Sequence, residues 1–345
     1  MKSIRFNQTM VAAALAFATL SAQAAIALSP AFTALYVFGD SLSDSGNNAL
    51  IIGADPLQVI TGNTYVPTKP YGMNAYTNGQ TWVNSFAIGL GLAASGLPSM
   101  SGAGNYAYGG ARTVLNGTDV PTAPGFPPSA TTQLLGGPIA LPWMNGYLTG
   151  LASVPATALY VIAIGGNDVR DLSEATLLAV PGTQPIPVAA NAYATAVGNL
   201  VDALQAKGAQ RIIVWDTPDV GRTPAALAGP PGFAGLATLV SASFNVALSA
   251  RLALEPSSVT MFELFGVTNT IIGNPGAYGL TNVTDACGAV LGCNPSQYLF
   301  WDGIHPTSAG HALIASSMLA AVPEPSSMLM LAVGICGLVA WRRRT

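Results

Sequence analysis

The segment Ala34-Leu35-Tyr36-Val37-Phe38-Gly39-Asp40-Ser41-Leu42-Ser43-Asp44 joins a short apolar run to a polar turn. The run is rich in β-branched and aromatic residues, as is typical of a buried parallel strand. The Gly-Asp-Ser that follows fits a sharp turn opening a helix, which would place the Ser41 hydroxyl at the edge of a sheet. Free backbone N–H groups at such a helix start favour a developing negative charge. The segment therefore predicts that Ser41 is a nucleophile, and the alternative is an N-cap serine in a polar turn.

Strand and helix patterns alternate along the rest of the chain. Apolar runs typical of strands lie at 159–164, 211–216 and 259–264, and a weaker one lies at 105–109. Helical spacing of apolar residues marks the segments 80–92, 189–207 and 235–254. This alternation predicts an α/β fold, in which helices cover both faces of a mainly parallel sheet. Ligands bind such sheets at the carboxyl ends of the strands, where most polar clusters of this sequence fall.

Two long stretches, 51–78 and 116–145, have no clear helix or strand pattern, and the second is dense in Pro and Gly. Loops of this length usually carry function in compact domains. We expect these two stretches to form walls of a substrate cleft, and the alternative is a surface covering of the sheet.

The amino-terminal residues have the composition of an export signal. Lys2 and Arg5 precede an apolar run from Met10 to Leu20, and small residues suited to cleavage follow. Residues 1–24 are therefore predicted to form a secretory signal peptide, which implies signal peptidase as a partner during export.

The carboxyl-terminal residues 322–345 form a second expected signal. A Pro-Glu-Pro motif precedes an apolar stretch and three arginines. The stretch is short for a membrane span, which needs about 20 apolar residues. This tail resembles the PEP-CTERM sorting signal of Gram-negative bacteria, which implies recognition by an exosortase, transient membrane contact through the tail, and delivery to the cell envelope or the extracellular matrix.

The expected folded part, residues 25–321, is long enough for one large domain. Charged residues make up 8% of the 345-residue chain, against about 25% in an average soluble protein. The two expected signals hold five of the 12 basic and one of the 15 acidic residues, so the remainder carries a net charge of −7. This balance excludes nucleic acid as an expected partner. We expect a mature domain that does not span a membrane.

Two of the three cysteines, Cys287 and Cys293, lie in the expected exported domain. Oxidising conditions outside the cytoplasm favour a disulfide between them. The alternative is a pair of free buried thiols.

Two further segments predict groups that would bind an oxyanion near Ser41. The strand at 159–164 ends in Gly-Gly-Asn-Asp, so the Asn167 side chain would lie at the same sheet edge as a donor. The weaker strand would bring the backbone N–H of Gly110 there, with the adjacent Gly109 as the alternative. A structural alternative for Asn167 is a helix N-cap.

The chain has only two histidines, so a general base near neutral pH is expected to be His305 or His311. His305 follows Asp302 by three residues, and that carboxylate can fix the tautomer of the ring and leave the other nitrogen to Ser41. His311 is expected to pack in or cap the helix that follows. A metal site made of Asp40, Asp44, Asp302 and His305 is the alternative, but Ser41 and the Gly-Gly-Asn turn favour hydrolysis without metal. No G-x-G-x-x-G motif follows a strand, so we expect no dinucleotide and no other cofactor.

These blocks together resemble the GDSL, or SGNH, hydrolases. That family is marked by Ser in Gly-Asp-Ser-Leu, a Gly in a second block, Asn in Gly-x-Asn-Asp, and His in Asp-x-x-His, and here the four blocks occur in that order over residues 34–320. The resemblance implies a three-layer α/β/α sandwich of flavodoxin type and ester hydrolysis through an acyl-enzyme on Ser41. It implies His305 as base, Asp302 as its orienting partner, and an oxyanion hole made by Ser41, Gly110 and Asn167.

The identity of the ester remains open between several hypotheses. A general esterase or lipase is expected, and a polysaccharide deacetylase or a phospholipase or acyltransferase would use the same chemistry. A non-catalytic matrix protein of the same fold is the alternative of another class.

Overall fold

Four parallel strands form the central sheet of the computed structural model, which describes residues 32–64, 68–118, 120 and 122–322. They lie in the order β1-β2-β3-β4. Their bounds are β1 (Leu35–Gly39), β2 (Leu159–Ala163), β3 (Ile212–Trp215) and β4 (Val259–Phe262). The predicted parallel sheet is therefore confirmed. The predicted signal peptide, residues 1–24, lies outside the described residues. The predicted sorting signal, residues 322–345, also lies outside them except for Val322.

The segment around Asn105 runs along the free edge of β1 without becoming a regular strand. Tyr106 N–H donates to the Val37 carbonyl at 2.8 Å, and Tyr108 N–H donates to the Gly39 carbonyl at 3.1 Å. Asn105 forms only isolated bridges, one with Val37 and one with Pro98, so the predicted strand at 105–109 was wrong. The physical reason is the Asn105 side chain, which accepts the Ala107 N–H at 3.0 Å and competes with a regular ladder. With this segment counted, the strand order matches the flavodoxin-like 2-1-3-4-5 arrangement.

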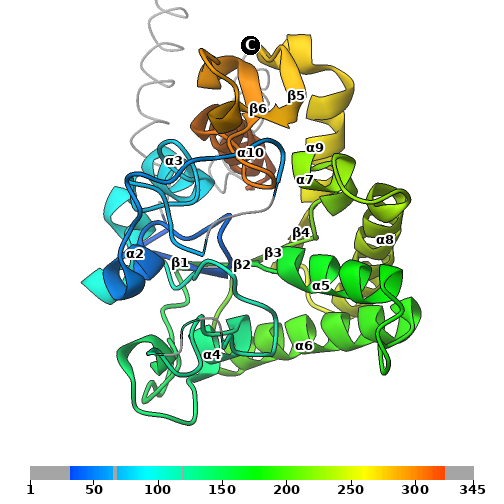
Figure 1. The fold of residues 1–345 in the computed structure, drawn as a ribbon. Coiled ribbons are helices and arrows are strands. Elements are labelled where there is room, and N and C mark those ends of the chain that lie inside the picture. Colours follow the sequence, from blue (N-terminus) through cyan, green and yellow to red (C-terminus); the bar gives the residue numbers. More distant parts are fainter. Residues whose placement is uncertain (1–31, 65–67, 119, 121, 323–345) are drawn as a thin grey trace, which may run out of the picture. The chain divides into compact units, whose positions relative to one another are not determined.

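Helices cover both faces of the sheet, which confirms the three-layer architecture (Figure 1). On one face lie α5 (Gly166–Leu177), α6 (Ile186–Ala206) and α8 (Phe233–Leu252), whose buried residues share one core with Ile162 and Val214. On the other face lie α3 (Trp82–Gly89) and α10 (Ser308–Ala321). There the Trp215 ring stands 4.3 Å from the Trp82 ring. The three helical patterns of the sequence correspond to α3, α6 and α8.

The shorter elements lie between these layers and near the carboxyl terminus. They are α2 (Asn47–Ile52), α4 (Ala130–Leu135), α7 (Pro224–Leu227), α9 (Leu264–Gly273) and a separate parallel pair, β5 (Asn282–Ala286) and β6 (Tyr298–Phe300). Helix α4 falls inside the stretch 116–145, which the sequence predicts to be irregular. It begins at a Ser129 cap that accepts the Thr132 N–H at 3.2 Å, and it is too short for a periodic pattern to identify.

Cys287 and Cys293 are joined by a disulfide directly after β5, and their Cα atoms lie 5.6 Å apart. This bond closes a short loop ahead of β6 and of the Asp302–His305 segment.

Helix α8 is the one helix among the described residues that is long and apolar enough to cross a membrane by length and composition. Its residues Ala237, Val240, Phe244 and Leu248 are buried in the core against α6 and the sheet. This packing is that of a core helix.

The end of β3 is joined to the start of α9 by Asp216, whose carboxylate accepts the Phe265 N–H at 2.9 Å. Burial raises the pKa of Asp216 to about 7, although the backbone N–H groups of Phe265 and Leu264 lower it. The folded chain therefore binds a proton at this carboxyl more tightly than the unfolded chain does.

We predict that Asp216→Asn becomes more stable relative to the parent chain as pH rises. The raised pKa of Asp216 makes the parent's free energy of unfolding fall between about pH 4 and 7, whereas Asn does not titrate and still offers an oxygen to Phe265. Urea unfolding at about pH 4.5 and 7.5 measures the difference. Asp55→Asn, at a half-buried turn, is the control. A stability difference for Asp216→Asn that does not change with pH contradicts the prediction.

Candidate active site

Ser41, His305 and Asp302 meet at the carboxyl edge of the sheet. The Ser41 Oγ atom lies 2.7 Å from His305 Nε2, and His305 Nδ1 lies 2.7 Å from Asp302 Oδ2. All three residues are buried, with Ser41 the most accessible at 8% exposure. The structure thus brings together the serine, the histidine and the aspartate that the sequence singles out.

A tight turn after β6 holds the Asp302–His305 segment. Asp302 Oδ1 accepts the backbone N–H groups of Ile304 at 2.8 Å and His305 at 2.7 Å. Trp301 N–H donates to the His305 carbonyl at 2.8 Å, which closes the turn from the other side. The His305 ring is therefore fixed by its own backbone as well as by its partner.

Tyr71 is a further contact of Asp302. Its hydroxyl donates to Asp302 Oδ2 at 2.8 Å, on the oxygen that also faces the His305 ring. Burial raises the pKa of Tyr71, and the Asp302 charge raises it further, so this hydroxyl stays a donor. Burial alone would raise the pKa of Asp302, but the His305 ring and the backbone N–H groups outweigh it and hold that pKa below its ordinary value. Sequence reasoning missed Tyr71, which lies in the irregular stretch 51–78 and in no motif.

The turn that carries Ser41 is organised by the buried carboxylate of Asp44. It accepts four backbone N–H groups, those of Gly46 at 2.8 Å, Asn47 at 2.7 Å, Asn48 at 3.2 Å and Gly109 at 3.0 Å. Burial raises the pKa of Asp44 to about 6, and these N–H groups oppose the shift. Asp44 therefore joins the Ser41 turn to the glycine segment beside it.

The chain enters this turn through Gly39, which allows a close approach of the backbones. A Cβ atom there would lie 2.5 Å from the Ala163 carbonyl oxygen. The Gln133 side chain accepts the Gly39 N–H and donates to the Gly39 carbonyl, each at 2.8 Å. Gln133, in the middle of α4, thus binds both backbone groups of Gly39 and helps to fix the position from which Ser41 emerges.

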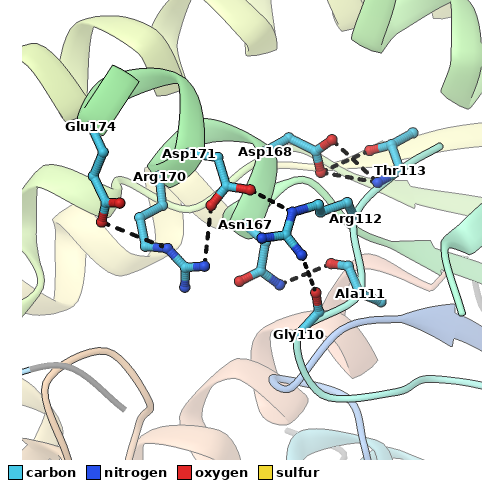
Figure 2. Close-up of polar contacts among 9 residues, drawn as sticks. All are labelled: Gly110, Ala111, Arg112, Thr113, Asn167, Asp168, Arg170, Asp171 and Glu174. Carbon is cyan, nitrogen blue, oxygen red and sulfur yellow. Dashed lines mark hydrogen bonds and ion pairs between the residues drawn. The ribbon is translucent and has the colours of Figure 1, made fainter. Parts of the chain in front are cut away.

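Gly110 and Asn167 lie close to each other at the same edge (Figure 2). The Asn167 Nδ2 donates to the Ala111 carbonyl at 2.8 Å, and one of its two hydrogens remains for another acceptor. Gly110 has a φ of 82°, which favours glycine. The Gly109 N–H, the alternative donor, is already bound to Asp44 at 3.0 Å.

The segment that follows Gly110 is tied to the start of α5 by polar contacts, as Figure 2 shows. Asp168 accepts the Thr113 N–H at 3.0 Å and its hydroxyl at 3.1 Å. Arg112 forms an ion pair with Asp171, and Arg170 lies 3.2 Å from the other oxygen of that carboxylate. These contacts hold Gly110 and Asn167 at a fixed separation.

A pocket of about 280 Å³ opens over this edge. We call it the polar pocket because it holds the charged and hydrogen-bonding side chains of the site, although apolar atoms make up the larger part of its lining. Ser41, His305, Gly110 and Asn167 line it together with Arg112, Arg170, Thr68, Tyr76, Phe126 and Pro127. The last four residues come from the two irregular stretches, which therefore form walls of the pocket. This pocket is large enough for part of a small substrate.

His311 lies apart from these contacts, fully buried in α10. Burial lowers the pKa of His311 to about 3, so its ring is neutral. Neither ring nitrogen finds a hydrogen-bond partner among the described residues.

The sequence left a metal site as an alternative for Asp40, Asp44, Asp302 and His305. Within the described ranges, no three His, Cys, Asp or Glu side chains are grouped as ligands. The Asp44 carboxylate accepts backbone N–H groups of its own turn, and the Asp302 carboxylate is hydrogen-bonded to the His305 ring.

A serine, a histidine and an aspartate in this contact order are the arrangement found in serine hydrolases. The chain belongs to the GDSL-like lipase/acylhydrolase family, whose model matches residues 35–318. A PEP-CTERM protein-sorting motif matches residues 321–344 and indicates export in Gram-negative bacteria. Both resemblances inferred from the sequence are therefore confirmed.

Several curated proteins are similar to this chain. Esterase EstA of Pseudomonas aeruginosa is 31% identical over 358 aligned positions, covering 95% of this chain and 52% of that protein. A GDSL esterase/lipase of Arabidopsis thaliana is 26% identical over 86% of this chain and 91% of its own length. Acetylajmalan esterase 2 of Rauvolfia serpentina is 26% identical over 88% of this chain and 93% of its own length. The chain spans about half the length of the Pseudomonas relatives it matches.

We predict that Tyr71→Phe lowers kcat by about 10-fold and leaves KM nearly unchanged. The variant removes one hydrogen bond to an ionised carboxylate and retains the ring, and such bonds contribute about 1.5–3 kcal/mol. Steady-state hydrolysis of p-nitrophenyl butyrate measures the effect, with Tyr278→Phe at an exposed position as the control. An unchanged kcat would show that Asp302 does not need this donor.

Proposed function

We propose that this protein is an exported carboxylic ester hydrolase that works through an acyl-enzyme on Ser41. The observation that carries the proposal is the continuous contact from Ser41 Oγ through the His305 ring to Asp302, with 2.7 Å at each step. The family match and the names of the relatives, which include several esterases, support it.

In the first half of the proposed reaction, His305 Nε2 takes the proton of the Ser41 hydroxyl while Oγ attacks the ester carbonyl carbon. The resulting imidazolium is stabilised by the buried Asp302 carboxylate, whose low pKa keeps it ionised. The tetrahedral intermediate then collapses, the bond to the alcohol oxygen breaks, and His305 gives its proton to the leaving alcohol. Ser41 is left as an ester of the acyl group.

The charge on the tetrahedral oxygen requires donors that are already in place. In this proposal they are the backbone N–H groups of Ser41 and Gly110 and the remaining Nδ2 hydrogen of Asn167. The contacts of Asp44 with Gly109, and of Asn167 with Ala111, support this arrangement, because they position the donors before substrate binds. Removal of one such donor typically costs about 10²–10³ in rate.

In the second half, water attacks the acyl carbon and His305 takes a proton from it. The serine oxygen leaves with that proton, and the carboxylic acid is released. Every group needed belongs to this chain, and the proposal requires no cofactor.

The two ends of the chain support an extracytoplasmic site of action. The PEP-CTERM motif implies sorting by an exosortase, and the signal peptide expected at 1–24 would be removed by signal peptidase. We therefore place the hydrolase at the cell envelope or outside the cell. The intact contacts of Ser41 weigh against the hypothesis of a non-catalytic matrix protein.

We predict that Ser41→Ala lowers kcat for p-nitrophenyl butyrate by at least about 10³-fold, because the acyl-enzyme cannot form. His305→Ala should cause a similar loss, and the two losses should not add, since both residues serve one step. Ser153→Ala, an exposed serine, is the control. Intact activity in either Ser41→Ala or His305→Ala would overturn the mechanism.

A further inference from the structure

A second hollow lies next to the polar pocket and differs from it in chemistry. It has a volume of about 420 Å³ and is mostly apolar. We call it the groove and define it by Leu177, Val220, Ala226, Ala228, Phe233 and Ile304. It lies between α5 on one side and α7 and α8 on the other. Asn63 and Thr64 of the irregular stretch 51–78 also line it, as the sequence predicts, whereas the walls from α5, α7 and α8 were not predicted.

The groove shares lining residues with a small hollow beside Ser41. This hollow of about 50 Å³ is lined by Ser41, Asn167 and His305. Val220 and Ile304 line both the small hollow and the groove. These shared residues mark the route that a chain bound to the Ser41 oxygen would follow into the groove.

Arg170 and Ile304 line both the groove and the polar pocket and so mark the boundary between them. The Arg170 guanidinium lies 3.2 Å from Asp171 and 3.9 Å from Glu174, which also lines the groove (Figure 2). Arg112, which also pairs with Asp171, lies on the polar side only. The charged groups thus pair with one another along one wall of the groove, and most of the remaining lining is apolar.

The position of His305 decides which part of an ester suits each hollow. The leaving alcohol oxygen takes its proton from the imidazolium, so it must lie on a side that His305 faces. His305 lines the polar pocket and the small hollow, and it is not among the groove's lining residues in the described part of the chain. His305 thus faces the start of both routes, and the lining beyond it distinguishes them. The groove is mostly apolar and suits the acyl chain, which exchanges no proton, whereas the polar pocket with its charged side chains suits the alcohol.

We propose that the groove binds the acyl chain of a medium- or long-chain fatty acid ester, with a polar alcohol part in the pocket beside Arg112 and Tyr76. This inference rests on the proposed ester hydrolysis at Ser41. An acetyl group would leave the groove empty, so the proposal favours fatty acyl esters over acetylated polysaccharide. Each methylene that enters the groove adds apolar burial, which raises kcat/KM by about 2–4-fold until the groove is full.

The test measures kcat/KM of the purified protein for p-nitrophenyl acetate, butyrate, octanoate and laurate. The parent should prefer octanoate over acetate by at least about 10-fold. Leu177→Asp places a charge in the groove, and Ala228→Trp fills it from an exposed position at the end of α7. Each variant should lower the octanoate-to-acetate ratio by about 10-fold or more.

Two matched variants control for effects of the new side chains themselves. Leu239→Asp changes a leucine on α8 that is 56% exposed and lies outside the groove. Ala253→Trp changes an exposed alanine that ends α8 as Ala228 ends α7. Both should keep the parent's ratio.

The outcomes separate this inference from the function on which it rests. Ser41-dependent hydrolysis that prefers acetate, or groove variants that keep the parent's ratio, would overturn the acyl groove and leave ester hydrolysis standing. Hydrolysis that persists in Ser41→Ala, or no hydrolysis of any of the four esters, would overturn both.

Discussion

The buried carboxylate of Asp44 is the contact on which the rest of the site depends. It accepts backbone N–H groups from its own turn and from Gly109, 65 residues further along the chain. A buried carboxylate is stable only when hydrogen-bond donors replace water around it, and burial has raised the pKa of Asp44 to about 6. These donors are backbone N–H groups of two segments, the Ser41 turn and the segment of Gly109, which must therefore lie side by side. The position of Ser41 relative to Gly110 thus follows from the solvation of one charge.

A second set of contacts joins the other half of the site to the same edge. Asp302 gathers the His305 ring, two backbone N–H groups and the Tyr71 hydroxyl. The two halves come from different sheets: β1 of the central sheet ends at the Ser41 turn, and the turn after β6 of the separate pair places the His305 Nε2 atom 2.7 Å from Ser41 Oγ. Fixed donors of this kind cost no reorganisation during a reaction, which is the basis of catalysis by preorganised polar groups.

The sequence predicted the residues that occur in compact local patterns. Ser41, Asn167 and the Asp302–His305 pair each lie beside a strand end or within a three-residue spacing, so their neighbours in space are neighbours in the chain. The alternation of strands and helices gave the parallel sheet for the same reason. The weak strand at 105–109 was wrong because the Asn105 side chain competes with the backbone ladder, which residue propensity does not describe.

Other parts of the site depend on packing between distant segments and leave no pattern in the sequence. Tyr71 reaches Asp302 across 231 residues, and Gln133 reaches Gly39 across 94. The groove is formed where α5 faces α7 and α8, and its residues are ordinary apolar side chains in each helix. The role that we propose for it, as the acyl side of the site, follows from its apolar lining and from its place beside the small hollow next to Ser41 and His305.

We expect a covalent acyl-enzyme to form on Ser41 during turnover. Rapid acid quenching of the protein during turnover of p-nitrophenyl octanoate, followed by peptide mass mapping, detects it. An octanoyl adduct should appear on the Ser41 residue and be absent in Ser41→Ala. Turnover without an adduct on Ser41, or an adduct on another residue that persists in Ser41→Ala, would contradict this expectation.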